Sequence, residues 1–213
     1  MPMSDPIDKK HSKLCIMQAA SRLFAKLGLD KCSTREIAKV SDSNISLISY
    51  YFGGKEGLYK EVMREYALEI KANVQEIVTG IDTQPITKEL FIKDITFMID
   101  HMIQTHIKNP EVSKIFAREK LAGLPHSREI HAEIFYPLIT QFFKLFKTGQ
   151  AQGFVKKDIH PALFFITLSE AIFGFYMLMD CQTPLVGDCQ DLLDNPSLLR
   201  DQFMKIYLKG VLE

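Results

Sequence analysis

Apolar residues recur at steps of three and four along most of the chain, the spacing that places them on one face of an α-helix. The first such stretch runs from about Asp8 to Leu27. Its expected apolar face consists of Leu14, Met17, Ala20, Leu23, Phe24 and Leu27. Gly28 follows directly, where a glycine commonly ends a helix. Alternation of apolar and polar residues is never sustained long enough to predict a strand, so the pattern predicts an all-α fold.

Two short helices and a long one are expected next. The first begins near Ser33 or Thr34, because Glu36 lies three residues after Ser33, at the spacing of a capping box. Turn-forming residues at 41–44 end it, and glycines end its successor. The helices that follow the turn are therefore expected over about Ile45–Tyr51 and Lys55–Val78.

The remaining chain carries longer helical patterns. They cover about Thr87–Ile107, Pro110–Leu121, Glu129–Gln152, Pro161–Cys181 and Pro196–Leu212. A polar, acidic loop is expected over residues 182–195. The apolar segment 161–179 contains Ser169 and Glu170 near its middle, and it is interpreted as a buried helix rather than as a membrane span.

The charge distribution adds a division that the net charge of zero hides. Residues 1–60 hold ten Lys or Arg and six Asp or Glu, whereas the rest of the chain holds 16 and 20. A weakly basic N-terminal part on an acidic body is typical of a DNA-binding module joined to a larger domain, although ordinary scatter would give the same balance. The polar N-terminus differs from a secretory signal, so we expect a cytoplasmic protein with reduced thiols.

Two helices of about seven residues, joined by a tight polar turn, can place the second helix in a DNA major groove. Short polar side chains and two phenols occupy this second helix and its start: Asn44, Ser46, Ser49, Tyr50 and Tyr51. Three further residues open helices, where backbone N–H groups favour a phosphate: Thr34, Arg35 and Lys55. The sequence thus predicts a helix-turn-helix between roughly Thr34 and Phe52.

A basic segment precedes the first helix or forms its start. It consists of Lys9, Lys10, His11 and Lys13. Such a segment can follow the DNA backbone or enter a minor groove. A solvated tail is the other interpretation of the same residues.

The residues of this region resemble the DNA-binding region of the TetR/AcrR family of regulators. The resemblance rests on Thr34–Lys39 and on the run Tyr-Tyr-Phe-Gly-x-Lys-Glu-x-Leu at residues 50–58. The pattern Ala-Ala-x-x-Leu-Phe-Ala-x-x-Gly at residues 19–28 also fits the first helix of the family. The resemblance covers roughly residues 10–60, whereas residues 61–213 match only in their length and helical pattern.

The resemblance implies a three-helix helix-turn-helix domain over residues 8–54. A larger helical ligand-binding and dimerisation domain follows over 55–213, beginning with a connecting helix over 55–78. It implies phosphate contacts for Thr34, Tyr51 and Lys55. Contacts with base edges are implied for Arg35, Asn44, Ile45, Ser46, Leu47 and Ser49. Phe52 and Leu58 fall at core positions of the family.

The turn departs from the family pattern. Ser41-Asp42-Ser43 stands where the family usually has Ala-Gly-Val, and Ser49 stands where it usually has Tyr. Asp42 can adopt the left-handed conformation of the missing glycine, although its carboxylate would repel a nearby phosphate. These changes leave the operator sequence open. They also motivate an alternative, a helical small-molecule-binding or interaction protein with a weakened DNA-binding motif.

The body is rich in Phe and Met, which suits a core and also an apolar pocket between helices. The resemblance implies such a pocket for a small-molecule effector. The candidate lining residues are Phe97, Met98, Met102, Phe116, Phe135, Phe142, Phe143, Phe173, Tyr176 and Met177. The apolar faces of the last two helices predict a dimer interface, unless burial within one chain accounts for them. Its candidate residues are Phe165, Ser169, Ile172, Phe173, Phe203, Ile206 and Tyr207.

Catalytic and metal-binding patterns are missing from the sequence. No nucleophile occurs at a recognisable spacing from a base, and no glycine-rich phosphate loop follows a strand. The four cysteines and the pair His101 and His106 lack metal-ligand spacing. We therefore expect neither an enzyme nor a cofactor or metal. The predicted function is a ligand-responsive repressor that binds a palindromic operator as a homodimer and is released by a small apolar molecule.

Overall fold

The computed structural model describes residues 6–80 and 86–212, with side chains described for 11–74 and 86–212. Within these ranges the chain forms helices and no strand, apart from one isolated antiparallel bridge between Val155 and Leu212. This confirms the predicted all-α class. Lys9 and Lys10 of the predicted basic segment lie outside the described side chains.

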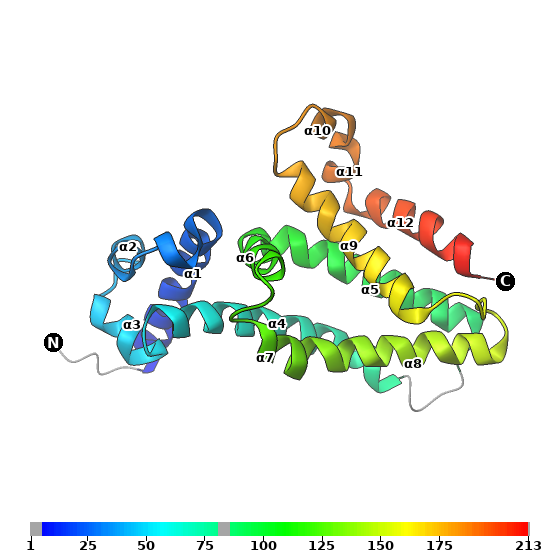
Figure 1. The fold of residues 1–213 in the computed structure, drawn as a ribbon, viewed down its shortest axis with the longest axis horizontal. Helices are drawn as coiled ribbons and strands as arrows, with labels where there is room; N and C mark the ends of the chain where they lie inside the picture. Colours follow the sequence, from blue (N-terminus) through cyan, green and yellow to red (C-terminus); the bar gives the residue numbers. More distant parts are fainter. Residues whose placement is uncertain (1–5, 81–85, 213) are drawn as a thin grey trace. The chain divides into compact units, whose positions relative to one another are not determined.

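The helices follow one another in the order shown in Figure 1. Their bounds are α1 Pro6–Lys31, α2 Thr34–Val40, α3 Ile45–Phe52, α4 Lys55–Gly80, α5 Lys88–Lys108, α6 Pro110–Leu121, α7 Arg128–Ile130, the π-helix η1 His131–Phe135, α8 Tyr136–Gln152, α9 Pro161–Met179, α10 Leu185–Asp188, α11 Gln190–Asp194 and α12 Pro196–Val211.

Two expected boundaries were wrong. The helix expected over Glu129–Gln152 is divided by η1, in which the hydrogen bonding widens from the α to the π pattern. The expected loop 182–195 contains the short helices α10 and α11. An α-helix that contains a short π segment has nearly the same apolar periodicity as a regular α-helix. The sequence pattern therefore did not reveal that η1 divides this helix.

Gly28 divides α1 into two helical segments. Its φ of 79° is left-handed, yet the helix resumes and continues to Lys31. The interruption leaves carbonyl groups of the preceding turn without helical partners. Arg118 of α6 supplies donors, because its Nη1 lies 2.7 Å from the Phe24 oxygen and its Nη2 lies 3.3 Å from the Lys26 oxygen. The predicted end of the first helical segment at Gly28 is therefore confirmed, and a short second segment to Lys31 follows it.

The chain divides into two compact units, one of residues 1–69 and 109–134 and one of 70–108 and 135–213. The predicted domain boundary between residues 54 and 55 stays a prediction. In the first unit α1 packs against α2 and α6. The largest fully buried side chains of this unit are Phe24, Ile16, Ile37, Ile48, Leu58, Met63 and Ile115. Leu14, expected on the apolar face of α1, is 54% exposed. The face of α1 that packs against α2 and α6 is a different one.

The core of the second unit is formed by α5, α8, α9 and α12 (Figure 1). One stripe of α5 is completely buried at intervals of four residues: Phe91, Ile95, Ile99 and Ile103. Aromatic rings of α8 and α9 pack against one another, with Phe142 and Phe164 stacked at 6.0 Å between centroids. Burial of each such side chain stabilises the fold by about 1.5–3 kcal/mol.

The apolar helix α9 is buried on one face only. Phe164, Leu168 and Ile172 lie in the core of the second unit, whereas Leu163 and Ile166 are 61% and 54% exposed. By length and composition α9 could cross a membrane, a test that core helices of soluble proteins also pass. The interpretation as a buried helix therefore holds for one face of α9, and among the described residues its outer face is exposed.

Candidate nucleic-acid interface

The start of α2 is fixed by a reciprocal cap. The Ser33 backbone N–H donates to Glu36 Oε2 at 2.9 Å, and the Glu36 backbone N–H donates to Ser33 Oγ at 3.2 Å. The hydroxyl of Ser33 also donates to the Glu36 carboxylate at 2.7 Å. These hydrogen bonds hold the pKa of Glu36 below its usual value. The capping box predicted from the spacing of Ser33 and Glu36 is confirmed.

The turn between α2 and α3 is closed by its backbone. Asp42 adopts a φ of 49°, the left-handed conformation predicted for it in place of glycine. The Ser43 N–H donates to the Ala38 oxygen at 3.0 Å. Ser41 Oγ donates back to the Ile37 oxygen at 2.8 Å. Serines therefore satisfy backbone groups at this turn, where the family usually places apolar side chains.

The third helix, α3, turns one face inward and leaves another exposed. Asn44 caps it, because its Oδ1 accepts the Ser46 backbone N–H at 2.9 Å. The same oxygen accepts the Ser46 hydroxyl at 2.8 Å. Ile48 is completely buried, whereas Ser49 and Tyr50 face outward, the latter with 72% of its surface exposed. The helix therefore presents a continuous outer surface while Ile48 anchors it.

The junction of α3 and α4 depends on glycine. Gly53 ends α3 at a φ of 71°. A Cβ atom added at Gly57, in the first turn of α4, would lie 1.8 Å from the Phe52 oxygen, far inside van der Waals contact. Leu58 is completely buried, as its motif position implies, and Phe52 is half-buried. The glycines of the motif are thus required sterically, because a side chain at Gly57 would collide with the end of α3.

Two lysines of the predicted DNA-binding region make contacts inside the first unit. Lys55 Nζ donates to the Leu29 oxygen at 2.8 Å and lies 3.4 Å from the Asp30 oxygen, so it caps the C-terminal end of α1. Lys13 pairs with Glu61 at 2.7 Å, and its ammonium lies 5.7 Å from the centroid of the Phe52 ring. A phosphate contact of Lys55 would therefore be shared with these carbonyl groups.

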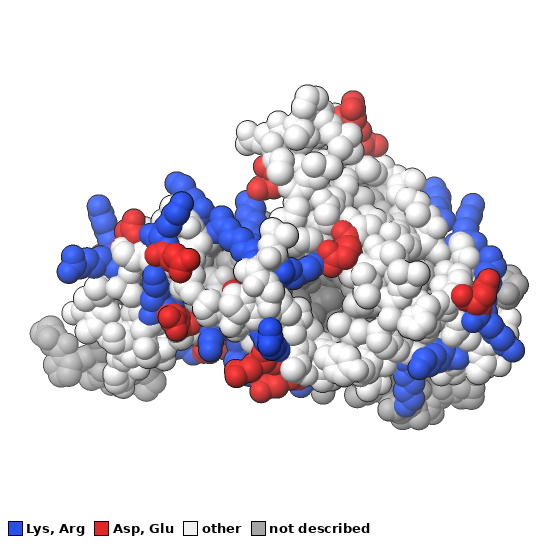
Figure 2. Space-filling model, in the orientation of Figure 1, with Lys and Arg blue, Asp and Glu red and all other residues white. Residues whose placement is uncertain are grey.

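The predicted DNA-binding residues come from α2, α3 and the start of α4. The exposed ones are Arg35, Asn44, Ile45, Ser46, Ser49 and Tyr50, and the half-buried ones are Thr34, Leu47, Tyr51 and Lys55. On the face shown in Figure 2, Lys and Arg side chains gather over α1 and α2. The structure brings these residues to one region of the first unit, and their contact with DNA stays a prediction.

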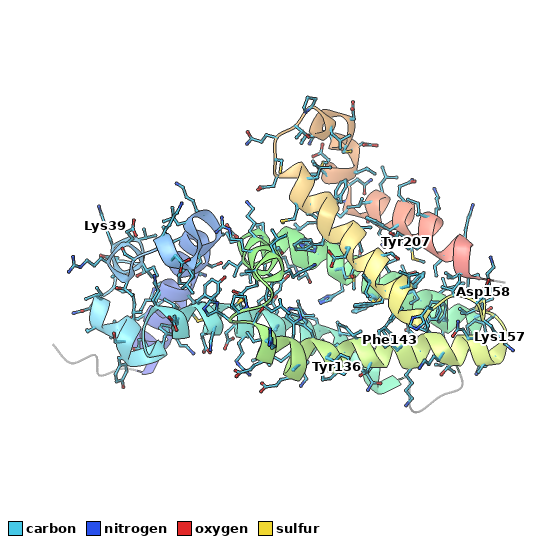
Figure 3. All side chains as sticks on the ribbon, viewed as in Figure 1. Lys39, Tyr136, Phe143, Lys157, Asp158 and Tyr207 are labelled. Atoms are coloured by element: carbon cyan, nitrogen blue, oxygen red, sulfur yellow. The ribbon has the colours of Figure 1, made fainter. Side chains whose placement is uncertain are left out.

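Lys39 was missed as a candidate. It lies four residues after Arg35 and therefore on the same face of α2, and it projects outward (Figure 3). It helps to line a shallow surface depression together with Arg35, Ala38, Asp42, Ser43 and Ile45. The spacing from Arg35 could have identified it.

The predicted pocket residues do not form one set. Phe116 belongs to the first unit, where it is buried with its ring centroid 5.9 Å from that of His131. Phe142 is buried among aromatic rings of the second unit. Phe97 is 42% exposed, because it points away from the buried Ile95 and Ile99 stripe of α5, so an interior position for it was wrong. The remaining candidates are half-buried: Met98, Met102, Phe135, Phe143, Phe173, Tyr176 and Met177.

The predicted dimer residues also divide. Ile172 and Phe203 are 0% and 8% exposed inside the protomer core, so the assignment of these two to a surface was wrong. Ile206 is 67% exposed. Phe165, Ser169, Phe173 and Tyr207 are half-buried. The candidates left out the exposed Leu163 and Leu178 of α9, because a helix with apolar residues on most of its sides gives little sign of which face is inside.

Comparisons with known proteins agree with this geometry. The family model described as "Bacterial regulatory proteins, tetR family" matches residues 16–62. The "Probable HTH-type transcriptional regulator YttP" of Bacillus subtilis is 35% identical over 82 residues, which is 38% of this chain and 40% of that regulator. The "HTH-type transcriptional repressor NicS" of Pseudomonas putida is 27% identical over 147 residues, 68% of this chain and 66% of that repressor.

Solved structures share the fold across nearly the whole chain. The ketosteroid transcriptional regulator KstR2 of Mycobacterium tuberculosis is similar with a TM-score of 0.72 at 16% identity, over 94% of this chain and 95% of that one. HlyIIR, a hemolysin II transcriptional regulator, is similar with a TM-score of 0.63 at 19% identity, over 93% of this chain and 98% of that one. At such identities the likeness concerns the fold.

Proposed function

Because the chain belongs to the TetR family of bacterial regulators, we propose that it is a ligand-responsive repressor that binds a palindromic operator as a homodimer. The observation that carries the proposal is the outer face of α3. A reciprocal cap, a closed turn and a glycine junction hold this helix, while Ile45, Ser49 and Tyr50 remain exposed on it. A helix held in this way can enter a major groove without losing its anchor.

The two kinds of DNA contact would come from different parts of the motif. Thr34, Tyr51 and Lys55 stand at helix ends, and they would hold the phosphates on either side of the groove. The base edges would be read by Arg35 on α2 and by α3 with its preceding residue: Asn44, Ile45, Ser46, Leu47 and Ser49. Since Asn44 Oδ1 already caps α3, only its amide N–H groups would remain for a base.

The homodimer would form through α9. Its outer face carries Leu163, Ile166 and Leu178, which are exposed in the single chain, with Gly174 on the same stripe. The exposed polar residues Thr167 and Glu170 interrupt this face, and the exposed apolar side chains around them mark it as an interaction site. A two-fold axis would bring the face against its own copy and place the two recognition helices about 34–36 Å apart, the spacing of successive major grooves.

The effector would bind in the second unit. Half-buried Met98, Met102 and Phe143 pack against the aromatic core there, which favours a small apolar molecule. Two polar groups could orient it. Burial raises the pKa of Tyr176 to about 12, so its hydroxyl stays protonated and able to donate. Within the described chain, the buried Oε1 of Gln141 has no hydrogen-bond partner. Effector binding would shift the dimer towards a form that fits the operator poorly.

The decisive experiment is an electrophoretic mobility shift assay. The DNA would be the region upstream of the gene and the products of a random-site selection. A sequence-preferring, salt-sensitive complex is expected, because phosphate contacts release counterions. The variants Arg35→Ala and Lys39→Ala should each weaken binding by about 10- to 100-fold. A cytoplasmic location would follow from the binding of genomic DNA.

Lys147→Ala provides the matched control, since it removes the same charge from an exposed position on α8 of the second unit. It should leave DNA binding unchanged. Absence of any sequence-preferring complex would contradict the proposal. If Arg35→Ala and Lys39→Ala bound DNA as the parent does, the motif would be vestigial, and a helical small-molecule-binding or interaction protein would be favoured instead. Asp42 is the observation behind that second candidate.

A further inference from the structure

The outer surface of the helix-turn-helix contains a shallow depression of mixed chemistry. It is lined by residues of α2, of the turn and of the start of α3: Arg35, Ala38, Lys39, Asp42, Ser43 and Ile45. Two of these side chains are apolar, and Ile45 is 42% exposed although it is a large aliphatic residue. Ile45 therefore offers an apolar contact at the first residue of the recognition helix.

Arg35 and Lys39 would attract a phosphate, but the rest of the lining does not suit one. Asp42 contributes a carboxylate from a left-handed position in the turn, and a phosphate beside it would meet a like charge. Ala38 and Ile45 offer no hydrogen bond to an anion. Nor is the serine hydroxyl available as a donor, because Ser43 Oγ donates to the Ser41 oxygen at 3.1 Å. The depression therefore fits the edge of a base pair better than the backbone of DNA.

One base pair matches this set of groups. Thymine is the base that places a methyl group in the major groove, beside its O4 acceptor, and its adenine partner presents an N7 acceptor and an N6 amine. Ile45 would contact the methyl group, Arg35 would donate to an acceptor, and Asp42 would accept from the amine. Lys39 would remain at the rim, near the backbone. The first residues of a recognition helix are those that reach base edges.

We propose that this depression selects a T·A base pair in each half-site, with the thymine 5-methyl group packed against Ile45. The inference rests on the proposed function, since it specifies what the DNA-binding surface reads. It makes Ile45 a specificity-determining residue and gives Asp42 a role in place of the glycine that the family usually carries there.

Replacement of thymine by uracil tests the proposal, because it removes the methyl group and leaves every hydrogen-bonding group of the base pair. Each thymine of a selected operator would be replaced in turn, and the affinity of the parent protein measured by competition. One thymine in each half-site should be sensitive. The expected loss is about four-fold for one half-site and about fifteen-fold for both, the effect of burying one methyl group and two.

The variant Ile45→Ala identifies the side chain responsible. It should bind the thymine and uracil operators with equal affinity, since the contact with the methyl group is gone. Val40→Ala is the control: Val40 is an exposed aliphatic residue of α2 outside the depression, and its variant should keep the preference of the parent for thymine. Both variants alter exposed positions, and circular dichroism would verify their folding.

The outcomes separate this inference from the proposed function. Failure of the random-site selection to yield any operator would contradict the proposed function, and this inference with it. A bound operator that tolerates uracil at every position would overturn the inference alone. The same holds if Ile45→Ala keeps the full preference for thymine.

Discussion

At the scale of single residues, Glu119 organises the end of α6. Its side chain is 3% exposed. One carboxylate oxygen accepts the backbone N–H groups of His126 and Ser127 at 2.9 and 3.0 Å. The other lies 3.1 Å from His126 Nδ1 and accepts the Tyr59 hydroxyl at 3.3 Å. One buried carboxylate thus joins α6, the turn before α7 and the first half of α4.

The charge of Glu119 is maintained by these donors. Burial alone would raise the pKa of this carboxyl, but the hydrogen bonds from His126 and Ser127 outweigh burial, so its pKa lies below the usual value. Burial and the neighbouring Glu119 carboxylate together raise the pKa of Tyr59, which keeps its hydroxyl protonated and donating. The phenol and the carboxylate therefore hold complementary protonation states at neutral pH.

We predict that Glu119→Gln lowers the free energy of unfolding by about 1–3 kcal/mol at pH 7. The amide group keeps one acceptor oxygen, but its N–H₂ group cannot accept the hydrogen bonds that the second carboxylate oxygen accepts. A carboxyl whose pKa is lowered by folding contributes stability above its unfolded value, near 4.5, and loses it as the pH falls through the folded value. The difference between parent and variant should therefore shrink below about pH 4.5. Urea denaturation at several pH values measures this difference.

Glu133→Gln is the control for that prediction. Its carboxylate is 59% exposed and pairs with Arg64 at 3.1 Å. Exposed pairs contribute between about 0 and 1 kcal/mol. If the two variants were equally stable at pH 7, the buried hydrogen bonds of Glu119 would not have the role assigned to them.

At the scale of elements, the short helices of the first unit depend on their ends. The seven residues of α2 are too few for a helix to be stable by itself. The cap at Ser33 and the burial of Ile37 and Ala38 supply the stability that the helix propensity of so few residues does not. The same reasoning applies to α3, with its cap at Asn44 and its anchor at Ile48.

Ser33→Ala should lower the free energy of unfolding by about 1 kcal/mol, the usual effect of removing a cap. The hydroxyl accepts from Glu36 N and donates to the Glu36 carboxylate, so both halves of the reciprocal cap are weakened. Ser49→Ala makes the same chemical change on the exposed face of α3 and should alter stability by less than about 0.5 kcal/mol. Thermal and urea unfolding would compare the two. Equal effects would show that the cap is dispensable.

At the scale of the whole molecule, the outer face of α9 matters most. Leu163, Ile166 and Leu178 of α9 are exposed, whereas Phe164, Leu168 and Ile172 are buried. An exposed apolar helix face of this length is unfavourable in water unless something covers it. A second copy of the chain is the cover that we propose.

Ile166→Asp should weaken the proposed homodimer on the order of 100-fold or more, because the two-fold axis would bring charged groups together in an apolar interface. The substitution should leave the protomer folded, since Ile166 is 54% exposed there. Sedimentation velocity over a range of concentrations would measure the dissociation constant. Leu121→Asp, at a residue of α6 that is 91% exposed, should leave the association unchanged. A dimer of undiminished stability in Ile166→Asp would exclude this face.

The local features of the first unit can be identified from the amino-acid sequence alone. The cap of α2, the left-handed turn residue Asp42, the glycine junction before α4 and the bounds of α3 all follow from residues that lie within a few positions of one another. Hydrogen bonds and steric clashes at such short range do not depend on the rest of the fold, so their residues could be identified directly.

Features that depend on distant residues were settled by the folded structure. It selected the buried faces of α1 and α9, because the helices that pack against them come from elsewhere in the chain. It directed Lys55 to the end of α1, and it placed Arg118 on the carbonyl groups freed at Gly28. It also brought Arg35, Asp42 and Ile45 to one depression. Apolar periodicity shows that a helix has a buried face, but the helices that pack against it determine which face is buried.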